Sequence, residues 1–140
     1  MPATAASRSA RRGVVALIAV SLVCAAAVLR AQPANPFIGS WQAKFLVSTA
    51  RGLMDERQAD LVITPTGGTW QTRVQSRTDP CIGREVPLHI DELTDSRLTG
   101  TLRFSSLADF CKDLKLVLQV DASGTVVGRR GNTELSLERK

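Results

Sequence analysis

The sequence contains no tyrosine, a single histidine (His89), two tryptophans and three cysteines in 140 residues. A metal centre needs several convergent His, Cys or carboxylate ligands, and nucleophilic catalysis needs a nucleophile beside a base. The sequence shows neither arrangement and has no phosphate-binding glycine loop. We therefore expect no metal, no cofactor and no enzymatic activity. Strand alternation places His89 on the surface, between the outward carboxylates of Glu85 and Asp91.

Residues 1–31 have the layout of an export signal. Three arginines between residues 8 and 12 precede an apolar run from Val14 to Leu29, and Ala31 supplies a small residue at a cleavage position. We expect a signal peptide (1–31), with its exact cleavage site left open, and a periplasmic or secreted product. A run of 16 residues falls just below the roughly 18 that span a membrane as a helix. Retention as an N-terminal anchor is therefore the alternative to cleavage.

The exported part has almost no net charge. Four of the 18 Lys and Arg residues lie in the signal, which leaves 14 against 13 Asp and Glu. Without a basic block, neither nucleic acid nor an anionic membrane surface is an expected partner. The remaining 109 residues are enough for one core. We expect a short proline-containing linker (32–36), a single domain (37–140) and no stable membrane span after signal cleavage.

Cys81 and Cys111 are the only cysteines after residue 31. In an oxidising compartment they are expected to form a disulfide, which would stabilise the fold by about 3–4 kcal/mol through the loop that it closes. A redox pair would need a C-x-x-C spacing, and a metal site would need further ligands beside the single His89; the chain has neither. The bond would join two irregular segments, 77–83 and 105–112, at the same end of the molecule. One helical turn is expected in the second segment.

Apolar and polar residues alternate from Trp41 onward, which is typical of β-strands with one buried face. Turn-forming residues follow several of these runs, as in 65–68, 121–124 and 131–132. The sequence predicts an all-β fold, a small eight-stranded antiparallel up-and-down barrel, because pairing the first strand with the last removes exposed edges. A flattened sandwich is the alternative. The inward positions are Trp41, Ala43, Phe45 and Val47; Ala59, Leu61 and Ile63; Trp70, Thr72 and Val74; Val86, Leu88 and Ile90; Leu98, Gly100, Leu102 and Phe104; Leu114, Leu116, Leu118 and Val120; Val126 and Gly128; and Leu135 and Leu137.

The first strand begins with Gly39-Ser40-Trp41, and this Gly-x-Trp pattern resembles the motif that opens the lipocalin and avidin-like barrels of the calycin group. The resemblance implies a lipocalin-like barrel in which Trp41 packs across one end and an arginine of the last strand, Arg139, lies against it. The chain departs from lipocalins by its shorter length, by the missing second motif around Thr-Asp-Tyr and by the lack of a C-terminal helix. Small exported bacterial proteins of this shape, including periplasmic metalloprotease inhibitors with one disulfide, are similar in size.

Three side chains are candidates for contact with a ligand. Trp41 and Trp70 have inward parity, where an aromatic ring either lines a pocket or fills the end of a barrel. Trp70 follows a glycine turn, so the sequence places it near a rim. Thr72 is the one polar side chain that the alternation predicts inside, and its hydroxyl needs a partner from the backbone, water or a ligand.

Four arginines, Arg73, Arg77, Arg84 and Arg103, occupy outward or loop positions around the third to fifth strands. If neighbouring strands align them, they form a cationic patch for an acidic ligand or partner. A mixed, solvated face is the alternative, because several carboxylates lie nearby in the sequence.

These features support a hypothesis of function. We expect an exported, non-enzymatic binding module that takes up a small apolar or amphipathic ligand at one mouth of the barrel. The alternative is an interaction or protease-inhibitor-like module of the cell envelope, whose disulfide-pinned loops contact another protein. The sequence identifies neither the ligand nor the oligomeric state.

Overall fold

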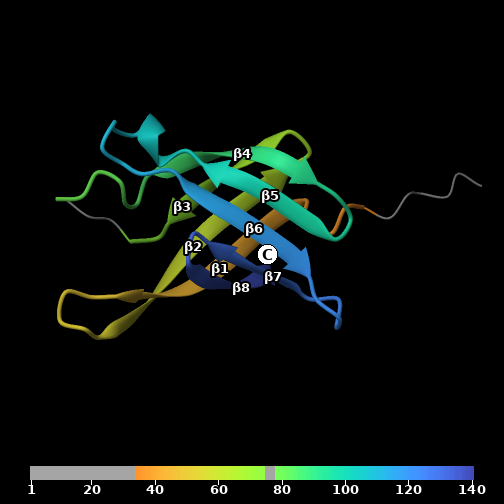
Figure 1. Cartoon of the computed structure of the whole chain (residues 1–140), viewed down its shortest axis with the longest axis horizontal. Coiled ribbons are helices and arrows are strands. Elements are labelled where there is room, and N and C mark those ends of the chain that lie inside the picture. Colours follow the sequence, from red (N-terminus) through yellow and green to blue (C-terminus); the bar gives the residue numbers. More distant parts are fainter. Residues whose placement is uncertain (1–33, 75–77) are drawn as a thin grey trace, which may run out of the picture. The chain divides into compact units, whose positions relative to one another are not determined.

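The computed structural model describes residues 34–74 and 78–140. Eight antiparallel strands form a closed barrel in which each strand pairs with its neighbours in sequence and β1 pairs with β8 (Figure 1). The predicted all-β, up-and-down barrel is confirmed, and its closure excludes the sandwich alternative. The strands are β1 (Gly39–Ser48), β2 (Met54–Thr64), β3 (Gly67–Thr72), β4 (Glu85–Leu93), β5 (Arg97–Leu102), β6 (Leu114–Val120), β7 (Val126–Arg130) and β8 (Thr133–Arg139), with a 3-10 turn, η1 (Phe104–Ser106), between β5 and β6.

Two of the sequence predictions cannot be followed in space. The expected signal peptide (1–31) and Arg77 lie outside the described residues. Within those residues, no helix has the length and apolar character needed to cross a membrane.

The core lies inside the barrel and consists of side chains from every strand. In the strands with more than one buried residue, the buried residues recur at every second position, as the alternation predicted. The largest side chains that are almost fully buried are Trp70, Phe37, Leu61, Ile63, Leu98, Leu102, Leu116, Leu118 and Val86. Packing of these side chains away from water supplies most of the favourable free energy of barrel closure, because burial of apolar surface is the dominant favourable term in folding.

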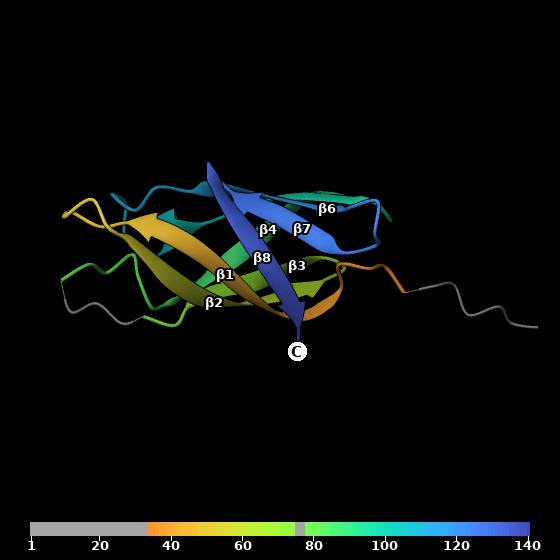
Figure 2. The same ribbon diagram turned by 90° about the horizontal axis from the view of Figure 1, so that it is seen from below.

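Successive strands run in opposite directions, so their connections alternate between the two ends of the barrel (Figure 2). We call one end the disulfide end. It is formed by the connections 49–53, 73–74 with 78–84, 103–113 and 131–132. We call the other the Trp41 end, formed by residues 34–38 and the turns 65–66, 94–96 and 121–125.

The Trp41 end is covered by its own chain. The indole N–H of Trp41 donates to the carbonyl of Phe37 at 2.8 Å, and Phe37 is fully buried. The guanidinium of Arg139 lies 4.4 Å from the centre of the Trp41 ring and donates to the carbonyls of Ile38 and Pro36. Arg139 therefore occupies the place that the Gly-x-Trp resemblance implied, and it binds the entering chain to the end of the last strand.

The structure differs from the sequence prediction at the edges of three strands. Strand β3 ends at Thr72, so Val74, expected as an inward residue of that strand, lies in the connection that follows it. Strand β2 begins at Met54, well before Ala59, and extends the β1–β2 hairpin beyond the barrel (Figure 1). Its first residues show no alternation of apolar and polar side chains, because this part of the strand pairs only with β1 and has no face that packs on the core. Strand β5 ends at Leu102, and the buried Phe104 belongs to η1, which is the expected helical turn one residue early.

Candidate functional site

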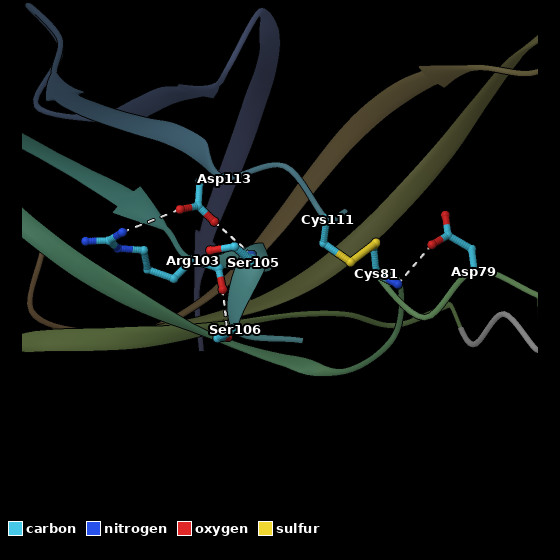
Figure 3. Close-up of a disulfide and its surroundings, with 7 residues drawn as sticks. All are labelled: Asp79, Cys81, Arg103, Ser105, Ser106, Cys111 and Asp113. Carbon is cyan, nitrogen blue, oxygen red and sulfur yellow. Dashed lines mark hydrogen bonds and ion pairs between the residues drawn. A yellow bond between two sulfur atoms is a disulfide. The ribbon is translucent and has the colours of Figure 1, made fainter. Parts of the chain in front are cut away.

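The disulfide links the two longest connections at one end of the barrel. Cys81 and Cys111 are bonded, with their Cα atoms 5.7 Å apart, which confirms the predicted pairing (Figure 3). Cys81 belongs to the connection after β3 and Cys111 to the connection after η1. The bond therefore fixes the distance between two segments that form one side of the barrel opening.

Local hydrogen bonds hold each segment in shape. The Asp113 carboxylate accepts the Ser105 N–H at 2.8 Å and lies 3.5 Å from the Arg103 guanidinium, and Asp79 accepts the Cys81 N–H at 2.9 Å (Figure 3). The Ser105 N–H is the main reason that the pKa of Asp113 lies below its ordinary value, and the Arg103 charge adds to the effect. The carboxylate of Asp113 thus stays charged and keeps the start of η1 in place.

A cavity of about 290 Å³ opens at the disulfide end. Its walls are mostly apolar, with a small number of polar groups, as is usual for small-molecule sites. The residues that line it are Phe45, Val47, Ser48, Arg57, Thr72, Cys81, Ile82, Phe104 and Arg130. They come from β1, β2, β3, β7, η1 and the disulfide-bonded connection, so the cavity exists only in the closed barrel.

Arg130 contributes the main charge of this cavity. Its guanidinium carbon lies 4.3 Å from the centre of the Phe45 ring and 5.1 Å from that of Trp70, and the two rings lie 5.8 Å apart. The Nε of Arg130 is buried and has no hydrogen-bond partner among the described residues. Burial lowers the pKa of the Arg130 guanidinium, which nevertheless remains charged at any physiological pH.

The rest of the cavity wall carries one further cation and two hydroxyl groups. Arg57 donates from Nε to Asp55 at 2.8 Å, so part of its charge is compensated. Thr72 accepts the indole N–H of Trp70 at 3.2 Å. Ser48 supplies the other hydroxyl, at the end of β1.

Comparison with protein-family models, with curated proteins and with solved structures found no match. The function has to be argued from the geometry of the site alone.

The structure separates the three residues that the sequence proposed as ligand contacts. Thr72 lines the cavity, and Trp70 reaches it through its contacts with Phe45 and Arg130. The prediction of Trp70 at a rim is wrong, because its side chain is fully buried and its strand begins at the opposite end of the barrel. Trp41 lies at the Trp41 end, where it contacts Arg139 instead of the cavity.

The described arginines of the predicted patch differ in their contacts: two form ion pairs and one is exposed. Arg73 forms an ion pair with Asp60 at 2.8 Å, and Arg103 forms one with Asp113 at 3.5 Å. Arg84 is exposed near the start of β4. A cationic patch from these residues stays a prediction, with much of the charge of its described members balanced by carboxylates.

Two further hollows lie outside the barrel. One, of about 760 Å³, separates the ends of β1 and β2 from β8, where pairing between β1 and β8 stops at Lys44 and Ser136. The other, of about 490 Å³, lies against β6, β7 and β8. The first carries charges of both signs and shares Phe45 and Ser48 with the cavity. The opening of the cavity thus continues along the seam between the first and last strands.

Metal-ligating side chains do not gather in the described part of the chain, which holds no group of three His, Cys, Asp or Glu residues close enough to bind an ion. His89 is exposed, as predicted, and lies 3.8 Å from Asp91 on the outer surface.

Sequence reasoning missed the two arginines of the cavity. Arg130 has the parity of Val126 and Gly128, and Arg57 has that of Ala59, so alternation already directed both side chains inward. The inward positions predicted for β7 ended at Gly128. The next inward position of the same alternation, two residues later, is Arg130.

Proposed function

We propose that this protein is an exported, non-enzymatic binding module of lipocalin-like shape, and that the cavity at the disulfide end receives a small amphipathic molecule. The cavity itself carries the proposal. It is the place where the interior of the barrel is left open, whereas the Trp41 end is covered by Phe37 and Arg139. Its mixture of aromatic, aliphatic and few polar groups is suited to a ligand with one apolar and one polar part.

Two further observations support this proposal. The disulfide is compatible with an oxidising compartment, in agreement with the export signal expected at residues 1–31. Arg139 packs on Trp41, which is the contact that the resemblance of the Gly-x-Trp motif to lipocalin-like barrels implied. The disulfide also limits how far the loops at the cavity can move apart, which favours a preformed site.

The test is a titration of the ¹⁵N-labelled exported domain with two six-carbon probes, sodium hexanoate and 1-hexanol, followed by NMR. At least one probe is expected to shift resonances of the cavity lining, such as Thr72, Ile82 and Phe104, and to leave the Trp41 end unchanged. Absence of saturable shifts with both probes would contradict the proposal.

A matched pair of variants provides the control. Val47 is half-buried and lines the cavity, and Val127 is exposed on the outer wall. Val47→Trp is expected to fill the cavity and abolish the titration, whereas Val127→Trp adds the same side chain outside and should leave binding unchanged. Equal binding by both variants would place the ligand elsewhere.

A protein-interaction module is the second candidate, and the exposed apolar residues at the disulfide end favour it. Phe110 is 70% exposed beside the disulfide, and Leu53 and Met54 of the β1–β2 hairpin are 66% and 61% exposed. Exposed apolar side chains that gather on one surface often contact a partner. In this case Phe110→Ser should abolish cross-linking to an envelope protein in the native host, and Val127→Ser should preserve it.

A further inference from the structure

We propose that Arg130 makes the cavity an anion site, so that the ligand is a small organic monoanion, a carboxylate joined to one ring or a short aliphatic chain. This inference rests on the proposed binding function and names the chemical class of its ligand. It is carried by the position of an arginine in the cavity that no carboxylate of the described lining residues balances.

The cavity lacks any negative group to balance Arg130. Among its lining residues in the described chain there are two arginines and no Asp or Glu. Three other arginines have partners: Arg73 binds Asp60, Arg57 binds Asp55, and Arg139 donates to two carbonyl groups. Arg130 has only the faces of Phe45 and Trp70, and its buried Nε–H points to no acceptor in residues 34–74 and 78–140.

Such a charge is costly unless something pairs with it. Arg130 is half-buried, and its Nε–H is the part that lies away from water. A buried donor without an acceptor destabilises the folded state, and contact with an aromatic ring offsets only part of that cost. Planar guanidinium groups bind carboxylates with two parallel hydrogen bonds. An anionic ligand would therefore satisfy Arg130 in a way that the chain does not.

Thr72 gives an independent indication of the same ligand. Its Oγ accepts the indole N–H of Trp70, and its own hydroxyl proton meets no acceptor within the described chain. A hydroxyl has one proton to donate, and that proton is still available in the cavity. Thr72 and Arg130 thus offer donors, and a ligand group that accepts hydrogen bonds fits both.

The size and charge of the cavity narrow the class further. A cavity of about 150 Å³ holds one benzene molecule. The volume here is about 290 Å³, so one ring or a chain of about six carbons fits together with a head group. One uncompensated guanidinium, with Arg57 partly neutralised by Asp55, matches a single negative charge better than the double charge of a phosphate ester.

The test compares hexanoate, 1-hexanol, hexylamine and hexyl phosphate by NMR titration of the intact exported domain at pH 7. Hexanoate is expected to bind about tenfold to a hundredfold more tightly than 1-hexanol, the range for a hydrogen bond to a charged group. It should also shift the Nε–H resonance of Arg130 itself. Hexylamine should bind most weakly, and hexyl phosphate no more tightly than hexanoate.

Variants on one strand supply the controls. Arg130→Gln should remove the preference for hexanoate over 1-hexanol, and Arg130→Lys should restore part of it. Arg129 is exposed, one residue earlier on the outer face, so Arg129→Gln removes the same charge outside the cavity and should leave the preference intact. If Arg130→Gln does not fold, the Nε–H shift of the wild-type protein still decides the question.

The outcomes separate the two proposals. Equal binding of hexanoate and 1-hexanol at the cavity would overturn the anion site and leave the binding function standing. Tighter binding of hexyl phosphate would overturn the monoanion class. No binding of any probe would overturn the binding function and the anion site together.

Discussion

Removal of the disulfide should cost this protein a large part of its stability. Cys81 and Cys111 are 30 residues apart in sequence, so their bond closes a loop of 31 residues. In the chain-entropy relation such a loop restricts the unfolded chain by about 3.7 kcal/mol at 25 °C. Domains of this size have total stabilities of about 5–15 kcal/mol. The Cys81→Ala/Cys111→Ala variant should therefore remain folded with roughly a quarter to three quarters of the original stability.

Urea unfolding followed by tryptophan fluorescence measures the difference. Trp41 and Trp70 are both buried, so their emission should shift when the barrel opens. The midpoint of the double variant should fall by the equivalent of about 3.7 kcal/mol, and its thermal midpoint should fall by about 15 °C. Alanine is the appropriate replacement, because Cys111 is buried and a serine hydroxyl would add an unmet polar group.

Reduction of the wild-type protein is the matched control. Wild-type protein with dithiothreitol should unfold at the midpoint of the double variant, and dithiothreitol should have no effect on the variant itself. A loss of less than about 1 kcal/mol in both cases would refute the argument that closure of this loop stabilises the barrel.

Three further predictions follow from individual contacts. Arg139→Gln should lower the free energy of unfolding by about 1–2 kcal/mol, because it removes two hydrogen bonds to carbonyls and the contact with Trp41, and an unchanged urea midpoint would contradict this. Hydrogen bonds from Arg73 and then Lys140 lower the pKa of Asp60 from 3.8 to about 2. The ionised carboxylate therefore contributes fully to the free energy of unfolding above pH 4, and this contribution is lost as the pH falls toward 2. Since the carboxylate is about a third exposed, solvent screening reduces that contribution to about 1 kcal/mol. In urea titrations, the free energy of unfolding of the wild-type protein should therefore fall by about 1 kcal/mol more between pH 5 and pH 2 than that of the Asp60→Asn variant. Arg130→Met should raise the free energy of unfolding by about 1 kcal/mol, because it relieves a buried donor that has no partner, and a marked loss of stability in the same assay would show that the aromatic contacts outweigh that cost.

The last of these predictions connects stability with function. If Arg130 destabilises the free protein and binds an anion, the site is a strained feature that a ligand relieves. Addition of hexanoate should then raise the thermal midpoint of the wild-type protein and have no such effect on Arg130→Met.

The strands and their buried faces could be predicted because both depend on neighbouring residues in the sequence. Leu114, Leu116 and Leu118 alternate with polar or half-exposed positions, and this period fixes the side of the strand that they occupy whichever strand lies next to it. The disulfide was predictable for a different reason, since only one pairing exists among the cysteines after residue 31. Where alternation was absent, as in Met54–Gln58, the start of strand β2 was not predicted.

The proposed binding site was harder to predict because its parts come from distant segments. The alternation along β7 predicts that Arg130 points inward, but the residues that surround its guanidinium come from β1 and β3. Trp70 was misplaced for the same reason. Its distance from a turn in sequence indicates nothing about which side chains cover it.

The sequence alone determined the eight strands, the face that each one buries and the disulfide, since local periodicity and a single possible cysteine pair are enough for these. Only the tertiary structure decided between closure of β8 on β1 and a flattened sandwich. Only it showed that the interior stays open at the disulfide end, and that Arg130 lies in this opening with no Asp or Glu among the described lining residues. These features depend on how the strands of the closed barrel are aligned against one another, which brings together residues far apart in the chain.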